Sequence, residues 1–118
     1  MEMKFISEKE VITRDDLRPL AEALFGTFVK AVVDIERREM VIGGELHADE
    51  ETILLEHGSK QANLWGINLY PDTTNEDWIE FDSMINLRPT QGNRSRGVED
   101  EALRKKIRAV VSLLVGDA

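Results

Sequence analysis

The stretch FVKAVVDI at residues 28–35 is β-branched and apolar on nearly both faces of an extended chain. A strand of this composition is buried on both sides, so we place it at the centre of a β-sheet. The charged residues 36–38 predict a turn into a second strand at residues 40–42, which ends at two consecutive glycines. The two strands form the nucleus of the predicted sheet.

The rest of the chain adds three strands and three helices to this nucleus. Strands are predicted at residues 3–7, 64–70 and 78–88, and the last has the clearest alternation of apolar and polar side chains. Apolar residues at helical spacing predict helices between Leu17 and Phe25 and, after an Asp100 cap, between Leu103 and Leu114. The ambiguous segment 48–57 is interpreted as a short helix that starts near Asp49.

These elements predict an α+β fold in the order β-α-β-β-α-β-β-α. We predict a single layer of largely antiparallel sheet, with about five strands and the helices packed on one face. This arrangement buries the apolar sides of the helices and the apolar side of residues 78–88. A chain of 118 residues is the size of one domain, so residues 1–118 are expected to form a single domain.

Composition narrows the classes of function. The chain has no cysteine, which excludes disulfides, thiolate metal sites and a cysteine nucleophile. No run approaches the ~18 apolar residues of a membrane span, and the first residues lack a signal-peptide pattern. We therefore expect a cytoplasmic protein with no membrane partner.

Charge is distributed unevenly along the chain. The net charge is −8, which makes nucleic acid an unfavourable partner. From Arg88 onward there are seven basic and four acidic residues, a net +3, so the rest carries −11. Such a molecule can bind a small anion locally while it repels a long polyanion.

Four segments resemble an uncharacterised prokaryotic family, domain of unknown function 5674. They are GGELHAD at 43–49, LWGINLYP at 64–71, EFDSMINLRP at 80–89 and GNRSR at 92–96. The resemblance runs from about Phe5 to Leu114. It implies a bacterial or archaeal origin, and it assigns no activity and no catalytic residue.

The first candidate site is a metal cluster at Glu45, His47 and Asp49. If the strand after Gly44 continues, Glu45 and His47 share a face, and Asp49 follows at a helix start. Imidazole with carboxylates at short spacing suits a divalent metal such as Zn²⁺ or Mn²⁺, the only cofactor that the pattern suggests. A hydrolytic site also needs a third ligand and a base, which Glu80, Asp82 or Asp34 could supply from neighbouring strands. The structural interpretation, in which Asp49 caps a helix and His47 bonds to the backbone, is favoured.

The second candidate is a polar patch on the sheet. Glu80 and Asp82 share one face of their strand, Lys30 and Asp34 share a face of the central strand, and Asn68 lies on a third strand. Neighbouring strands would bring these side chains together, and paired carboxylates can act as acid and base. A solvated face with weak ion pairs is the favoured interpretation.

The third candidate is the loop at residues 88–97, in which Arg88, Asn93, Arg94 and Arg96 could grip a phosphate or carboxylate. A surface loop whose arginines pair with acids of the same molecule is the favoured alternative.

The leading functional hypothesis is a small binding domain for a partner protein or a small anion. The alternative is a metal-assisted hydrolase that uses Glu45, His47 and Asp49 with strand carboxylates. The predicted edge strand at residues 3–7 also offers a pairing surface for a homodimer.

Overall fold

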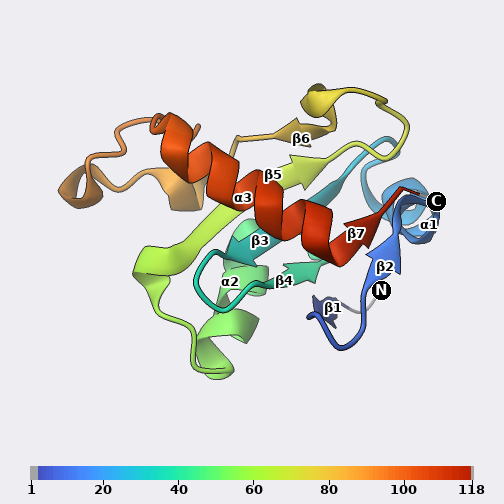
Figure 1. Cartoon of the computed structure of the whole chain (residues 1–118), viewed down its shortest axis with the longest axis horizontal. Coiled ribbons are helices and arrows are strands. Elements are labelled where there is room, and N and C mark those ends of the chain that lie inside the picture. Colours follow the sequence, from blue (N-terminus) through green and yellow to red (C-terminus); the bar gives the residue numbers. More distant parts are fainter. Residues whose placement is uncertain (1–2, 118) are drawn as a thin grey trace.

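The computed structural model describes residues 3–117 and confirms the α+β class. A five-stranded sheet has the order β1-β4-β3-β5-β6, and every neighbouring pair is antiparallel (Figure 1). Its strands are β1 (Lys4–Ile6), β3 (Val29–Asp34), β4 (Glu39–Ile42), β5 (Leu64–Leu69) and β6 (Ile79–Glu80). The sequence did not predict a second, parallel ladder between β2 (Ile12–Thr13) and β7 (Val115–Gly116), which joins the two ends of the chain.

Strand β3 is central, as its apolar composition predicts. Its alternate residues Val29, Ala31 and Val33 belong to one hydrophobic cluster, and Val32 belongs to another on the opposite face. All four side chains are inaccessible to solvent. The sheet therefore has a packed layer on each side of β3.

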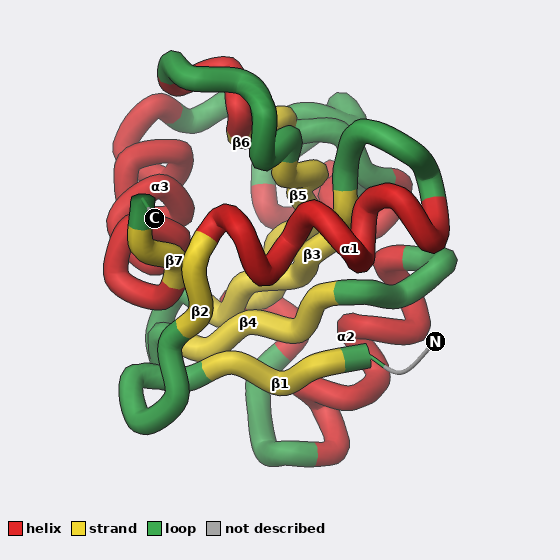
Figure 2. Tube along the Cα trace, turned by 90° about the vertical axis from the view of Figure 1, so that its right-hand side faces the viewer, coloured by secondary structure: helices red, strands yellow, loops and turns green. Residues whose placement is uncertain are grey.

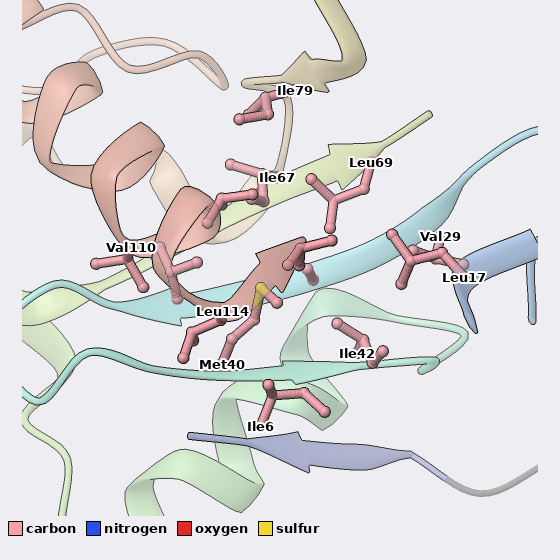
Figure 3. Packing of buried hydrophobic residues seen from close by; sticks show 14 of the residues in the cluster. Ile6, Leu17, Val29, Met40, Ile42, Ile67, Leu69, Ile79, Val110 and Leu114 are labelled. Carbon is pink, nitrogen blue, oxygen red and sulfur yellow. The ribbon is translucent and has the colours of Figure 1, made fainter. Parts of the chain in front are cut away.

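Helices α1 (Arg14–Leu24) and α3 (Glu101–Leu114) cover the first of these faces. Val110 and Leu114 of α3 point toward Met40 of β4 and Ile67 of β5 (Figure 3). The helical spacing of apolar residues in both segments correctly identified the sides that are buried. Asp100 caps α3, because its carboxylate accepts a hydrogen bond from the Ala102 N–H at 2.9 Å.

Helix α2 (His47–Glu56) lies on the opposite face, which corrects the expectation that all helices pack on one face. Leu54 of α2 packs with Val32, Val41 and Leu64 there, and Figures 1 and 2 show α2 and α3 on opposite sides of the sheet. The physical reason is that β3 is apolar on both faces, so each face needs a cover. We call the face that α2 covers the α2 face.

The predicted strand at residues 78–88 is also corrected, because β6 ends after Glu80. The outer edge of β5 is paired by side chains beyond that point. The Asn86 amide accepts from the Gly66 N–H at 2.9 Å and donates to the Gly66 carbonyl at 3.0 Å, and the Arg88 guanidinium donates to the Leu64 carbonyl. Two polar side chains thus replace the backbone of a longer strand.

The remaining segments contain four short 3₁₀ helices. These are η1 (Gln61–Asn63), η2 (Glu76–Trp78), η3 (Met84–Asn86) and η4 (Pro89–Gln91). Helix η3 lies close to β5 because Gly66 has no side chain: a Cβ there would lie 2.6 Å from the Ser83 Cβ. This close approach positions Ser83 and the following residues beside the α2 face.

Candidate functional site

A row of polar side chains crosses the part of the α2 face that α2 leaves uncovered. Lys30 of β3 is opposite Asn68 of β5, and Asn68 is opposite Glu80 of β6. The sequence predicted a patch here if these strands were neighbours, and the sheet order meets that condition. Lys30, Asn68 and Glu80 therefore lie side by side on one face.

Hydrogen bonds hold the acidic end of this row. The Asn68 amide donates to the Glu80 carboxylate at 2.8 Å, and the Tyr70 hydroxyl donates to the same oxygen at 3.2 Å. Lys30 takes part in none of the ion pairs among residues 3–117. Its ammonium group lies 5.3 Å from the centroid of the Phe25 ring. The cationic end of the row is thus left without a carboxylate partner.

The start of α2 lies beside Lys30, and the strand does not continue past Gly44, which was the condition for the metal cluster. Strand β4 ends at Ile42, Gly43 turns the chain with a φ of 85°, and His47 is the first helical residue. His47 therefore follows helical rather than strand geometry, and the predicted shared strand face with Glu45 does not form. Leu46 occupies the N-cap and provides no side-chain acceptor for the first-turn N–H groups.

His47 is buried and bonded to the backbone. Its Nε2 lies 2.8 Å from the Ile67 carbonyl oxygen, and a carbonyl only accepts, so this nitrogen carries the proton. Burial lowers the pKa of His47 below its usual value, although the bond to Ile67 opposes the shift, so the ring is neutral near pH 7. The favoured interpretation of His47 as a backbone-bonded residue matches this geometry.

The metal candidates do not converge in the described part of the chain. Glu45 and Asp49 are exposed, whereas His47 is buried. Between residues 3 and 117, no three histidine, aspartate or glutamate side chains lie close enough together to hold a metal ion. The geometry therefore offers no support for the Glu45, His47 and Asp49 centre.

Arg96 approaches the α2 face from the loop after η4. Its backbone carbonyl accepts from the Ser83 N–H and from the Asn86 amide, both at 3.0 Å. Its Nε pairs with the Asp82 carboxylate at 2.8 Å, while its terminal nitrogens form no hydrogen bond within the described residues. The loop thus presents a guanidinium group on an anchored backbone.

Lys30, His47 and Arg96 line one pocket with a volume of about 170 Å³. Ser83 completes its polar lining, and within the described part of the chain no carboxylate belongs to that lining. The apolar part of the lining consists of Leu46, Ala48, Met84 and Ile85. Two cationic side chains and the positive end of the α2 dipole therefore meet at one concavity.

Glu50 lies in α2 near this pocket and was not singled out from the sequence. It is fully buried, and its carboxyl accepts from the Gly44 N–H at 2.9 Å. Burial raises the pKa of Glu50 from an ordinary 4.5 to about 8, although the Gly44 bond and Lys30 favour the charged form. Acidic residues are common in the first turn of a helix, so Glu50 does not stand out in the sequence. The only sequence signal for its burial was its position three residues after His47, on the same side of the helix.

The remaining predicted binding residues have internal partners or lie elsewhere. Asp34 accepts from the N–H groups of Glu36 and Arg37 in the β3–β4 turn. Buried Arg88 donates to the carbonyls of Gln61, Leu64 and Ile85. Asn93 donates to the carbonyls of Asn86, Ser95 and Gly97, and Arg94 is exposed outside the pocket. Among the loop candidates, only Arg96 reaches the pocket.

Residues 5–114 match the model of a family described as "Protein of unknown function (DUF5674)". The chain belongs to this family. No curated protein and no solved structure matches it. The family assignment bears out the resemblance of the four segments, and it carries no activity.

Proposed function

We propose that this protein is a binding domain for a small anion and that the pocket at the start of α2 is its site. The observation that carries the proposal is the lining of the pocket: Lys30 and Arg96 line it, and none of its lining residues among 3–117 carries a carboxylate. Lys30 has no ion-pair partner within residues 3–117, and the terminal nitrogens of Arg96 have no hydrogen-bond partner there. An anion would provide one for both.

The backbone of α2 supports the same ligand chemistry. The N–H groups of a first helical turn carry a partial positive charge and bind anions when no side chain caps them. Leu46 cannot cap, and Ala48 of the first turn lines the pocket. His47 is neutral and contributes no charge, so the attraction comes from Lys30, Arg96 and the helix end.

Charge elsewhere on the molecule limits the ligand to a small one. The net charge of −8 opposes a long polyanion, so nucleic acid remains an unfavourable partner. Among residues 3–117 no helix is long and apolar enough to cross a membrane. A cytoplasmic location, a prokaryotic origin and a homodimer paired through β1 remain predictions.

Replacing Lys30 or Arg96 by alanine is expected to weaken anion binding about tenfold, because each loses a charge-assisted hydrogen bond of roughly 1.5 kcal/mol or more. The measurement is a titration with acetate and with inorganic phosphate at constant ionic strength, followed by NMR shifts of the Ala48 and Ser83 amides. Arg96 is exposed to solvent and a simple anion makes few contacts, so dissociation constants in the millimolar range are expected.

Arg94→Ala is the matched control, since Arg94 is an exposed arginine of the same loop that does not line the pocket. It is expected to leave the affinity unchanged. Equal losses in Arg94→Ala and Arg96→Ala would show that only the overall charge matters, and the proposed site would then be wrong.

A further inference from the structure

The apolar half of the same pocket bears on the class of its ligand. Met84 and Leu46 are 62% and 59% exposed, more than any other large hydrophobic side chain among residues 3–117. Both line the pocket that Lys30 and Arg96 also line. Scattered exposed apolar residues need no explanation, but two that line the same cationic pocket form a surface that an apolar group can cover.

The charges around the pocket limit the charge of the ligand. Lys30 and Arg96 supply two positive charges, while Asp82 pairs with Arg96 at 2.8 Å and Glu80 ends the polar row that begins at Lys30. Buried Glu50 is largely uncharged at neutral pH, because burial raises its pKa to about 8. The nearby carboxylates leave little excess positive charge, which favours a monoanion over a dianion.

The volume of the pocket limits the size of the ligand. It measures about 170 Å³, and an apolar cavity of ~150 Å³ is known to accommodate benzene. A carboxylate with a short branched or ring-shaped apolar group, roughly seven non-hydrogen atoms, has a comparable size. Drug-sized ligands need pockets of about 300 Å³ or more.

We infer that the ligand is a monocarboxylate with a short apolar group, whose carboxylate lies between Lys30 and Arg96 and whose apolar group lies between Leu46 and Met84. This inference rests on the proposed function, since it names the ligand class of that site. It excludes inorganic phosphate as the preferred ligand.

The test compares four probes by NMR titration of the intact protein at pH 7: 3-methylbutanoate, acetate, 3-methylbutanamide and inorganic phosphate. We expect 3-methylbutanoate to bind about tenfold more tightly than acetate, as partial burial of three additional carbon atoms predicts. The uncharged amide is expected to show no saturable shift, and phosphate is expected to bind more weakly than 3-methylbutanoate.

The double variant Leu46→Ala, Met84→Ala is expected to abolish the difference between 3-methylbutanoate and acetate while acetate binding persists. Both side chains are exposed, so the fold should tolerate the change. Val11→Ala removes a comparably exposed side chain, 55% accessible and outside the pocket, and is expected to preserve the tenfold difference.

The outcomes separate the inference from the function on which it rests. Equal affinity for acetate and 3-methylbutanoate, or tightest binding of phosphate, would overturn the ligand class while Lys30- and Arg96-dependent anion binding stood. If the amide bound as tightly as the carboxylate, both would be wrong. The proposed function itself would be overturned if no anion bound, or if Lys30→Ala and Arg96→Ala did not weaken anion binding.

Discussion

Replacing Asn86 by alanine is expected to lower the free energy of unfolding by about 3–4 kcal/mol. The buried Asn86 amide makes hydrogen bonds to the Gly66 N–H, the Gly66 carbonyl and the Arg96 carbonyl, at 2.9, 3.0 and 3.0 Å. Alanine leaves the Gly66 N–H and the Gly66 carbonyl unpaired at a buried sheet edge, and each buried unsatisfied group costs about 1–3 kcal/mol. The Arg96 carbonyl adds little to this cost, because it keeps its hydrogen bond from the Ser83 N–H at 3.0 Å.

The measurement is urea unfolding, with amide hydrogen exchange at Gly66 as a local readout. The Gly66 amide is expected to lose protection in Asn86→Ala more than the neighbouring amides of β5 do. Asn75→Ala is the matched control, because exposed Asn75 makes a single side-chain bond, to the Asp77 N–H at 2.9 Å. It should cost about 1 kcal/mol or less. Similar costs in the two variants would contradict the edge-pairing role of Asn86.

Glu50→Gln is expected to stabilise the protein at alkaline pH and to have little effect at acid pH. Burial raises the pKa of Glu50 to about 8. Between pH 4.5, the ordinary pKa of the group, and about pH 8, the Glu50 carboxyl has lost its proton in the unfolded chain and retains it in the folded chain. The stability contributed by the neutral carboxyl is therefore present below 4.5 and is lost as the pH rises through this window. Glutamine stays neutral throughout.

The size of the effect follows from the same shift. At 1.36 kcal/mol per pH unit, a pKa raised from 4.5 to about 8 corresponds to roughly 4–5 kcal/mol. Relaxation around the carboxylate recovers part of this, so we expect Glu50→Gln to gain about 2–4 kcal/mol over wild type between about pH 5 and about pH 9. The other titrating groups are the same in both proteins, so their contribution cancels when the free energies of unfolding of Glu50→Gln and wild type are subtracted at each pH.

Denaturant unfolding of both proteins across this pH range checks the prediction. Glu56→Gln is the control, because Glu56 is an exposed glutamate at the end of the same helix. It is expected to change stability by no more than a few tenths of a kcal/mol at any pH. A constant difference between Glu50→Gln and wild type would show that Glu50 is not buried as a neutral acid.

Local pattern predicted the elements whose own side chains decide their structure. The apolar spacing in α1 and α3 identified the buried sides of those helices, and the composition of residues 28–35 identified the central strand. The row of Lys30, Asn68 and Glu80 could be predicted only on the condition that three strands were neighbours. The order and register of distant strands depend on the whole sheet. The sequence therefore could not show whether these three strands are neighbours.

The failures share one physical cause, which is that tertiary contacts overrode a local pattern. Residues 81–88 alternate as a strand does, but Asn86 and Arg88 bond to β5 with their side chains and keep the backbone at a distance. The metal cluster at His47 required the strand to continue past Gly44, but the turn at Gly43 and the start of α2 aim the His47 ring at the Ile67 carbonyl. Neither contact has a signature within a few residues.

The sequence by itself determined the α+β class, the central strand, the buried sides of two helices, the family and the absence of cysteine chemistry. These features depend on composition and short-range periodicity, which are properties of the sequence and do not depend on tertiary contacts. Only the tertiary structure decided that α2 covers the second face, that Glu50 is buried, and that Lys30 and Arg96 share a pocket with Leu46 and Met84. Lys30 and Arg96 line the same pocket because of three features of the fold: the order of the strands, the position of α2, and the loop that Asn86 anchors.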